Sequence, residues 1–369
     1  MAHSRTDVPV AGDPNVALLD RFRRGDQRAL ARAISMVEDG GAAGQAVLRA
    51  LFRQGGNARV YGITGTPGAG KSALVERLAL AFRARLRRVA IVAVDPSSPF
   101  TGGAVLGDRV RMGTALADSD VYMRSLANRG HLGGLSLATE DVITILDAFG
   151  FEVVLVETVG TGQSEVEIMH IADATLVVMV PGSGDYVQAM KAGILEIADV
   201  YVVNKSDREG ADRTVANLMG MLDATHMGEP GLNRWPDDGG EKPSPTPRAS
   251  NRRANAGAHL IERFGSASPG AISWVPPVVK TVATEGVGVN AVADALVQHD
   301  RFMHESGRKA RHDRERAEMR LRHAVSVIAA GAVMSAAKAS GDLARAIAAV
   351  AERGVDPYSA AEDLMNRQS

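Results

Sequence analysis

The stretch Gly65-Thr66-Pro67-Gly68-Ala69-Gly70-Lys71-Ser72 fits the eight-position pattern G-x-x-x-x-G-K-[ST] at every position. An apolar, β-branched run at 60–64 precedes it, and a helical pattern begins near its last residue. A glycine-rich turn between a strand and a helix can direct backbone N–H groups inward, and the helix amino terminus favours negative charge. The stretch therefore predicts a phosphate-binding loop inside an α/β domain.

Residues 65–72 and Ala73 are expected to surround the phosphates of a nucleoside triphosphate. Lys71 is expected to reach the β- and γ-phosphates and to serve in catalysis, and the Ser72 hydroxyl is expected to bind Mg²⁺. The alternative is a chance glycine-rich turn. The strand before it and the helix after it argue against that alternative.

The surrounding sequence alternates short apolar runs with longer amphipathic stretches, such as 72–85 and 185–197. This alternation predicts a P-loop NTPase domain whose central, mostly parallel sheet is covered by helices on both faces. The expected strands are Val60–Thr64, Val89–Val94, Val153–Glu157, Thr175–Val180, Val200–Val203 and Trp274–Val282.

The tetrapeptide Asn204-Lys205-Ser206-Asp207 follows the apolar run 200–203. An N-K-x-D sequence after a late strand is typical of guanine recognition, because the Asp207 carboxylate can accept both the ring N–H and the exocyclic amine. Adenine would leave that carboxylate unpaired. A surface loop of this composition is the alternative, but the upstream phosphate-binding loop favours GTP over ATP.

The strand 153–156 ends in Glu157-Thr158-Val159-Gly160. Glu157 is expected to bind Mg²⁺ or polarise the attacking water, and the Gly160 N–H is expected to contact the γ-phosphate. Thr161 follows Gly160, so the water-orienting glutamine of Ras-type enzymes is absent there. Gln163 is near but displaced from that position, and it remains a candidate catalytic residue. We therefore expect slow intrinsic hydrolysis that a partner accelerates.

Two aspartates are further candidates at the carboxyl edge of the sheet, where open α/β sheets bind ligands. Asp95 closes the strand 89–94 and is expected to act as a base or to support Mg²⁺ binding. Asp108, followed by Arg109 in the glycine-rich loop 101–112, is the better candidate for an Mg²⁺ ligand or a switch residue. Ordinary helix-cap or turn aspartates are the alternative.

The bulk composition excludes several classes of protein. Among 369 residues, 42 basic and 43 acidic side chains leave no net charge that would attract nucleic acid or a membrane. The absence of cysteine excludes a disulfide framework, a thiol nucleophile and a thiolate metal site. The polar first 15 residues lack the apolar core of a signal peptide, which predicts a cytoplasmic protein, or an organelle-matrix protein if a transit peptide has been removed.

Composition also suggests where the segments divide. We expect a disordered N-terminus at 1–14, a helical arm at 15–56, a GTPase domain at 57–290 and a helical region at 291–369. A Pro- and Gly-rich stretch at 228–258 lacks the apolar residues needed for a packed structure and predicts a flexible insertion.

Together these motifs resemble the MeaB/ArgK-type P-loop GTPases, which are chaperones of adenosylcobalamin-dependent methylmalonyl-CoA mutase. Beyond the phosphate-binding loop, the resemblance extends from about residue 15 to the C-terminus, apart from the insertion. The segments that carry it are 28–35 (RALARAIS), 94–98 (VDPSS), 107–112 (GDRVRM), 157–160 (ETVG), 163–165 (QSE), 184–185 (GD), Lys191, 193–199 (GILEIAD) and 204–207 (NKSD).

The resemblance implies a homodimeric GTPase that binds the mutase, gates cofactor loading and protects the enzyme. It implies that residues 291–369 serve dimerisation and that 101–112, 157–163 and 181–191 are switch loops, with Arg109, Asp185 and Lys191 as switch residues. It also implies that Val282-Ala283-Thr284 is the guanine-contacting loop, with Val282 standing where relatives often have serine.

Two other functions remain as alternatives. A nickel metallochaperone GTPase needs Cys or His ligands near the nucleotide domain, and the lack of cysteine argues against it. A GTP-dependent phosphotransferase linked to amino-acid transport needs an acceptor site and a base placed for it. The identity of the acyl-CoA mutase, methylmalonyl-CoA mutase or a related isobutyryl-CoA mutase, also stays open.

Overall fold

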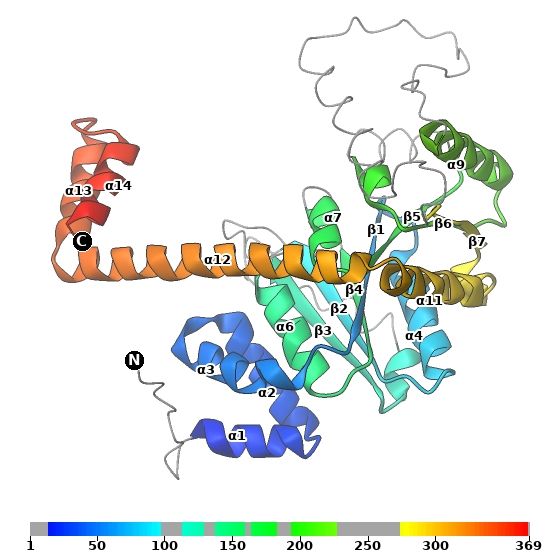
Figure 1. The fold of residues 1–369 in the computed structure, drawn as a ribbon, viewed down its shortest axis with the longest axis horizontal. Helices are drawn as coiled ribbons and strands as arrows, with labels where there is room; N and C mark the ends of the chain where they lie inside the picture. Colours follow the sequence, from blue (N-terminus) through cyan, green and yellow to red (C-terminus); the bar gives the residue numbers. More distant parts are fainter. Residues whose placement is uncertain are drawn as a thin grey trace, which may run out of the picture. The chain divides into compact units, whose positions relative to one another are not determined.

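The computed structural model describes residues 14–96, 113–128, 137–158, 164–182, 193–226 and 274–367. The chain divides into two compact units, Met1–Lys309 and Ala310–Ser369. The first unit contains the sheet and the second is helical (Figure 1). The predicted disordered N-terminus up to residue 13 and the predicted insertion at 228–258 lie outside the described residues.

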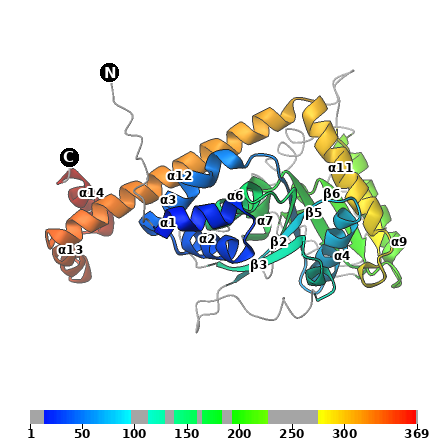
Figure 2. The same cartoon turned by 90° about the horizontal axis from the view of Figure 1, so that it is seen from below.

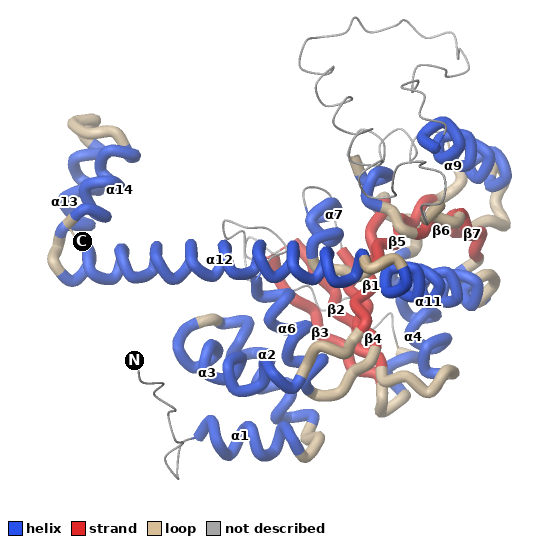
Figure 3. Tube along the Cα trace, in the orientation of Figure 1, coloured by secondary structure: helices blue, strands red, loops and turns tan. Residues whose placement is uncertain are grey.

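In the described part of the chain, seven parallel strands form one sheet in the order β3-β2-β4-β1-β5-β6-β7 (Figure 3). The predicted P-loop NTPase-type sheet is confirmed. One edge strand, β3, was not predicted, because Arg124 and Ser125 interrupt its apolar pattern. The strands are β1 (Arg59–Gly65), β2 (Val89–Pro96), β3 (Val121–Asn128), β4 (Val153–Thr158), β5 (Ala174–Met179), β6 (Val200–Asn204) and β7 (Val278–Thr281).

Helices cover both faces of the sheet, which explains why the strands are apolar on both sides (Figures 1 and 2). One face packs against α6 (Leu137–Ala148), α9 (Ala211–His226) and the N-terminal helices. The other packs against α4 (Lys71–Arg83) and α11 (Val289–Glu305). Short helices complete the unit: η2 (Ala115–Ala117), α7 (Ser164–Glu167), η3 (Ile168–His170), η4 (Ile194–Ile197) and η5 (Ala283–Glu285).

The N-terminal arm consists of helices, as predicted, and lies beside α6 (Figure 2). Its elements are α1 (Pro14–Arg23), α2 (Gln27–Asp39), α3 (Gly41–Leu51) and η1 (Phe52–Gln54). Asp26 caps α2 by accepting the N–H groups of Arg28 and Ala29, and Gly40, with φ 72°, separates α2 from α3. The Asp147 carboxylate of α6 accepts N–H groups of Gly56, Asn57 and Ala58, which attaches the segment between the arm and β1 to α6.

Ionisable side chains make hydrogen bonds and ion pairs at the amino edge of the sheet. Asp173 and Asp199 are buried there, and their carboxylates accept the N–H groups of Val60 and Thr175, each at 2.8 Å. Lys309 lies 3.3 Å from Asp173 and His299 lies 3.5 Å from Asp199. His299 lies on α11 and Lys309 lies at the start of α12 (Arg308–Ala339), so these two contacts attach the end of the first unit to the sheet.

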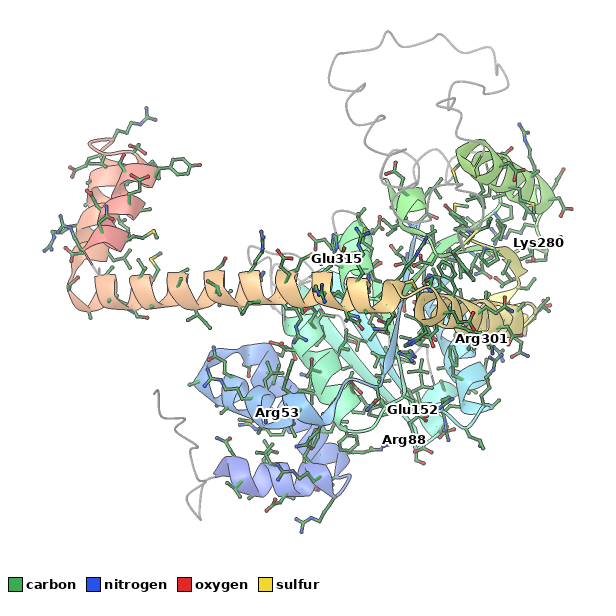
Figure 4. All side chains as sticks on the ribbon, viewed as in Figure 1. Arg53, Arg88, Glu152, Lys280, Arg301 and Glu315 are labelled. Atoms are coloured by element: carbon green, nitrogen blue, oxygen red, sulfur yellow. The ribbon has the colours of Figure 1, made fainter. Side chains whose placement is uncertain are left out.

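A further contact on this edge joins β2 and β4. The Arg88 N–H donates to Glu152 at 3.2 Å, and both side chains are labelled in Figure 4. These contacts occupy the amino edge, and the nucleotide motifs lie at the opposite, carboxyl edge.

The second unit contains most of α12 (Arg308–Ala339), together with α13 (Asp342–Ala351) and α14 (Pro357–Asn366). Large apolar side chains on these helices are exposed, including Leu321, Val325, Ile328 and Ile347. No single described helix is long and apolar enough to cross a membrane; α12 and α13 pass that test only as a pair, bent by 94°. The helical C-terminal region is as predicted, and its role in dimerisation stays a prediction.

Candidate functional site

The predicted phosphate loop and guanine motif meet at the carboxyl edge of the sheet. Because all strands are parallel, the loops that follow β1, β4, β6 and β7 emerge at this one edge. Direct side-chain hydrogen bonds join these loops across more than 70 residues of sequence, from β6 to both β1 and β7. The loops therefore form one connected site.

Three glycines shape the phosphate loop between β1 and α4. Gly65, Gly68 and Gly70 have φ values of 137°, 77° and 84°, which L side chains rarely adopt. A Cβ atom on Gly65 would lie 2.0 Å from the Val178 carbonyl oxygen, so the close approach of β1 to β5 also requires glycine there. The loop ends at Lys71, where α4 begins and directs its unpaired N–H groups toward the loop.

Lys71 lies inside the phosphate loop and is 7% exposed. Its ammonium group donates to the carbonyl oxygens of Gly65 at 2.7 Å and Thr66 at 3.1 Å. Burial lowers the pKa of Lys71 below its ordinary value, while the negative charges of Glu157 and Glu165 oppose that shift. A buried ammonium group inside a glycine-rich loop is a suitable counter-charge for a polyphosphate.

Ser72 and Glu157 lie together although 85 residues separate them. The Ser72 hydroxyl donates to Glu157 Oε1 at 2.7 Å, and Glu157 is 1% exposed at the end of β4. The neighbouring Thr158 hydroxyl donates to the Thr64 hydroxyl at 3.1 Å, which ties β4 to β1.

This pair fits the donor set of Mg²⁺. A hydroxyl and a carboxylate oxygen are hard ligands, and Mg²⁺ usually takes only one or two protein ligands beside substrate phosphates. In the described part of the chain, no group of three or more His, Asp or Glu side chains could hold a metal alone. The site therefore fits a metal that arrives with a phosphate-bearing ligand.

The Asn204 side chain links the phosphate loop to the predicted base loop. It is 2% exposed, and its amide nitrogen donates to the Ala69 carbonyl oxygen at 2.8 Å. Its amide oxygen accepts from the Thr281 hydroxyl and from the Ala283 N–H, each at 3.0 Å. Asn204 thus contacts the P-loop backbone on one side and the 282–284 loop on the other.

Lys205 adds a second link to the phosphate loop. Its ammonium group donates to the Gly68 carbonyl oxygen at 2.8 Å, and its backbone has a positive φ of 55°. Among the described residues, only Leu86 and Arg353 share a positive φ without being glycine. This conformation is strained for a lysine, and strain of this kind is common at ligand sites.

The Asp207 carboxylate is exposed in the turn after β6. No hydrogen bond or ion pair to its side chain occurs within the described ranges, whereas the preceding Ser206 N–H donates to the Thr281 carbonyl oxygen at 3.0 Å. The backbone thus fixes the turn, and the Asp207 carboxylate remains able to accept hydrogen bonds from a ligand. Of the predicted base loop, Ala283 is buried, Val282 is partly buried and Thr284 is exposed.

Seven predicted site residues lie at the limits of the described ranges or outside them. Asp95 is the last residue but one of β2 and pairs with Ala127 of β3, which puts its backbone at the carboxyl edge of the sheet; its side chain lies outside the described part of the structure. The other predicted residues that lie outside the described ranges are Asp108, Arg109, Gly160, Gln163, Asp185 and Lys191.

Comparison with known proteins agrees with this geometry. The family model described as methylmalonyl-CoA mutase-associated GTPase MeaB matches residues 30–339. The chain belongs to the MeaB family. The resemblance in the sequence motifs is therefore confirmed.

This MeaB-family chain is similar to curated proteins and to a solved structure over most or part of its length. A putative GTPase of Pyrococcus abyssi is 40% identical over 348 residues, 94% of this chain and 95% of the relative. A fused isobutyryl-CoA mutase of Geobacillus kaustophilus is 36% identical over 219 residues, 57% of this chain and 20% of that protein. The crystal structure of a LAO/AO transport system kinase has the same fold, with a TM-score of 0.60 at 23% identity, covering 98% of this chain and 100% of that one.

Sequence reasoning missed two contributors to the site of this MeaB-family chain. Thr281 donates its hydroxyl to Asn204, and Arg77 of α4 donates to the Thr284 carbonyl oxygen at 2.6 Å. Thr281 sits at the end of an expected strand, directly before the predicted base loop, and that position was an available signal. Arg77 has no local signal, because it is an ordinary arginine within a helix.

Proposed function

We propose that this chain binds GTP with Mg²⁺ and hydrolyses it to GDP and phosphate. The observation that carries the proposal is the Asn204 contact with both Ala69 and Ala283. It joins a phosphate-binding loop to a base-binding loop, so one ligand with both a polyphosphate and a purine fits the site. Asp207, whose carboxylate retains its accepting capacity, supplies the preference for guanine over adenine.

The residues around the phosphates have complementary tasks. The Lys71 ammonium would neutralise the β- and γ-phosphates, and its present contacts with the Gly65 and Thr66 carbonyl oxygens place it within the loop. Ser72 and Glu157 would hold Mg²⁺, which neutralises charge that develops on the phosphate oxygens. Without a glutamine directly after Gly160, intrinsic turnover is slow and depends on a partner for acceleration.

We further propose that the partner is a cobalamin-dependent acyl-CoA mutase, with methylmalonyl-CoA mutase as the first candidate. Two facts support this: the family is described as mutase-associated, and one relative is a mutase fused to a segment similar to this chain. In this role the GTPase acts as a chaperone that gates cofactor loading and protects the mutase, as a homodimer formed through residues 291–369.

Asp207→Asn tests the nucleotide assignment. We expect the variant to lose affinity for GDP and gain affinity for xanthosine diphosphate, because an amide both donates and accepts where the carboxylate only accepts. Asp223→Asn, at an exposed aspartate further along the following helix, is the matched control and should leave both affinities unchanged. Unchanged guanine preference in Asp207→Asn would refute the assignment.

The partner is tested separately. The full chain is mixed with cobalamin-dependent mutases from the same genome, in GDP and in a non-hydrolysable GTP analogue, and complexes are separated by size. We expect one mutase to form a complex whose amount differs between the two nucleotides. If none does, the chaperone role is wrong while the GTPase assignment stands.

A further inference from the structure

Arg77 connects the phosphate-binding helix to the predicted base loop. It lies six residues after Lys71 on α4, and its guanidinium donates to the Thr284 carbonyl oxygen at 2.6 Å across 207 residues of sequence. The helix that carries the phosphate-binding lysine therefore also contacts the loop on which the base is expected to rest.

Backbone hydrogen bonds close the outer half of the loop on itself, from the Glu285 N–H to Val282 and from the Gly286 N–H to Ala283, and the Arg77 contact attaches this closed turn to α4. The inner half of the loop is fixed by Asn204, which accepts the Ala283 N–H at 3.0 Å, and by the burial of Ala283 in the core. Thr284 is exposed and precedes Gly286, whose φ is 77°. A charge-assisted hydrogen bond from the Arg77 guanidinium to the Thr284 carbonyl oxygen is a second attachment of the loop, in addition to the one that Asn204 makes.

We propose that Arg77 is a positioning residue for base recognition. By holding the 283–285 turn against α4, it keeps the base loop at a set distance from the phosphate loop. Affinity for a nucleotide then depends on Arg77 through the base and not through the phosphates. The proposal rests on the assignment of the site to guanine nucleotides.

The chain offers a matched control on the same helical segment. Arg85, just past the end of α4, donates to Asp294 of α11 at 2.6 Å and spans 209 residues of sequence. The two arginines therefore make hydrogen bonds of the same length to partners at a similar separation in sequence, but only Arg77 contacts the base loop. If Arg77 only stabilised the fold, its removal would act like that of Arg85.

The experiment measures binding of GDP, ADP and inorganic tripolyphosphate to the full chain by competition with a fluorescent nucleotide. We expect Arg77→Ala to weaken GDP binding about fivefold to tenfold, the loss typical of one hydrogen bond to a charged group that is partly exposed. Tripolyphosphate affinity should stay within twofold. Arg77→Lys, which can still donate one hydrogen bond, should recover at least half of the GDP loss on a logarithmic scale.

Arg85→Ala should leave all three affinities within twofold. Melting temperatures without nucleotide, measured for every variant, show whether each is folded. If Arg77→Ala and Arg85→Ala have the same GDP affinity, or if tripolyphosphate binding falls together with GDP binding, the role of Arg77 is wrong. If the unsubstituted chain does not prefer GDP to ADP, the assignment of the site to guanine nucleotides fails instead.

Discussion

Asn204→Ala should destabilise the chain even when no nucleotide is present. The substitution removes the hydrogen bonds to Ala69, Thr281 and Ala283, which measure 2.8, 3.0 and 3.0 Å. Each contributes about 1 kcal/mol net, and the Ala69 carbonyl and Ala283 N–H lose their side-chain partner in a buried place. We therefore expect the free energy of unfolding to fall by about 3 kcal/mol.

The assay is urea unfolding of the nucleotide-free chain, monitored by circular dichroism. Asn217→Ala, an exposed asparagine on α9, is the control and should change the free energy of unfolding by less than about 0.5 kcal/mol. Asn204→Asp separates the two halves of the link. It keeps an acceptor for Thr281 and Ala283 but places an oxygen against the Ala69 carbonyl oxygen.

The result that would refute the reasoning is a loss below about 1 kcal/mol for Asn204→Ala, because a single net hydrogen bond would account for it. Asn204 would then serve only the ligand. A negligible loss in Asn204→Asp beside a full loss in Asn204→Ala would show that the acceptor contacts with Thr281 and Ala283 account for the whole effect.

Three further substitutions test the geometry. Gly70→Ala should lower the free energy of unfolding by at least about 1–2 kcal/mol in urea, since φ is 84° and the new Cβ would lie 2.5 Å from Asn204 Nδ2. Leu86→Gly should raise it by about 0.5–1 kcal/mol, because Leu86 is 86% exposed at φ 60°; an unchanged value would contradict the strain. The hydrogen bond from Arg83 lowers the pKa of Asp118 below its ordinary 3.8. This interaction therefore adds to the free energy of unfolding above pH 3.8, and that addition is lost as the pH falls below 3.8. Arg83→Met should therefore be less stable than the parent in thermal melts at about pH 7, and the gap should shrink as the pH falls through 3.8; a constant gap would refute this.

The sequence predicted the sheet well where strands are buried on both faces. An unbroken apolar run as short as 153–156, with a glutamate on each side, is typical of a buried strand, and it forms β4 as expected. The edge strand β3 was missed because it carries Arg124, whose side chain contacts Glu38 of the N-terminal arm. Local pattern could not reveal that contact, since the partner lies 86 residues away.

In the candidate site, too, the local features could be predicted from the sequence and the contacts between distant residues could not. The phosphate loop was predictable residue by residue, because its function requires glycines at fixed spacing and the loop lies between one strand and one helix. The tetrapeptide containing Asn204 was recognised as a base-reading motif, but its contacts with Ala69 and Ala283 span 135 and 79 residues. Those contacts depend on which strands are neighbours in the sheet, and sequence patterns do not specify strand order.

The positive φ of Lys205 has a different cause from those of Leu86 and Arg353. Leu86 follows the end of α4, where the N–H of Arg87 bonds to the Phe82 carbonyl oxygen, a helix-ending pattern that favours a left-handed residue. Arg353 likewise follows α13, and the N–H of Gly354 bonds to Ala349. Lys205 follows a strand, so no helix end requires its φ of 55°. What accompanies the conformation is the contact of its ammonium with Gly68 at 2.8 Å, and we therefore attribute the strain to attachment to the phosphate loop.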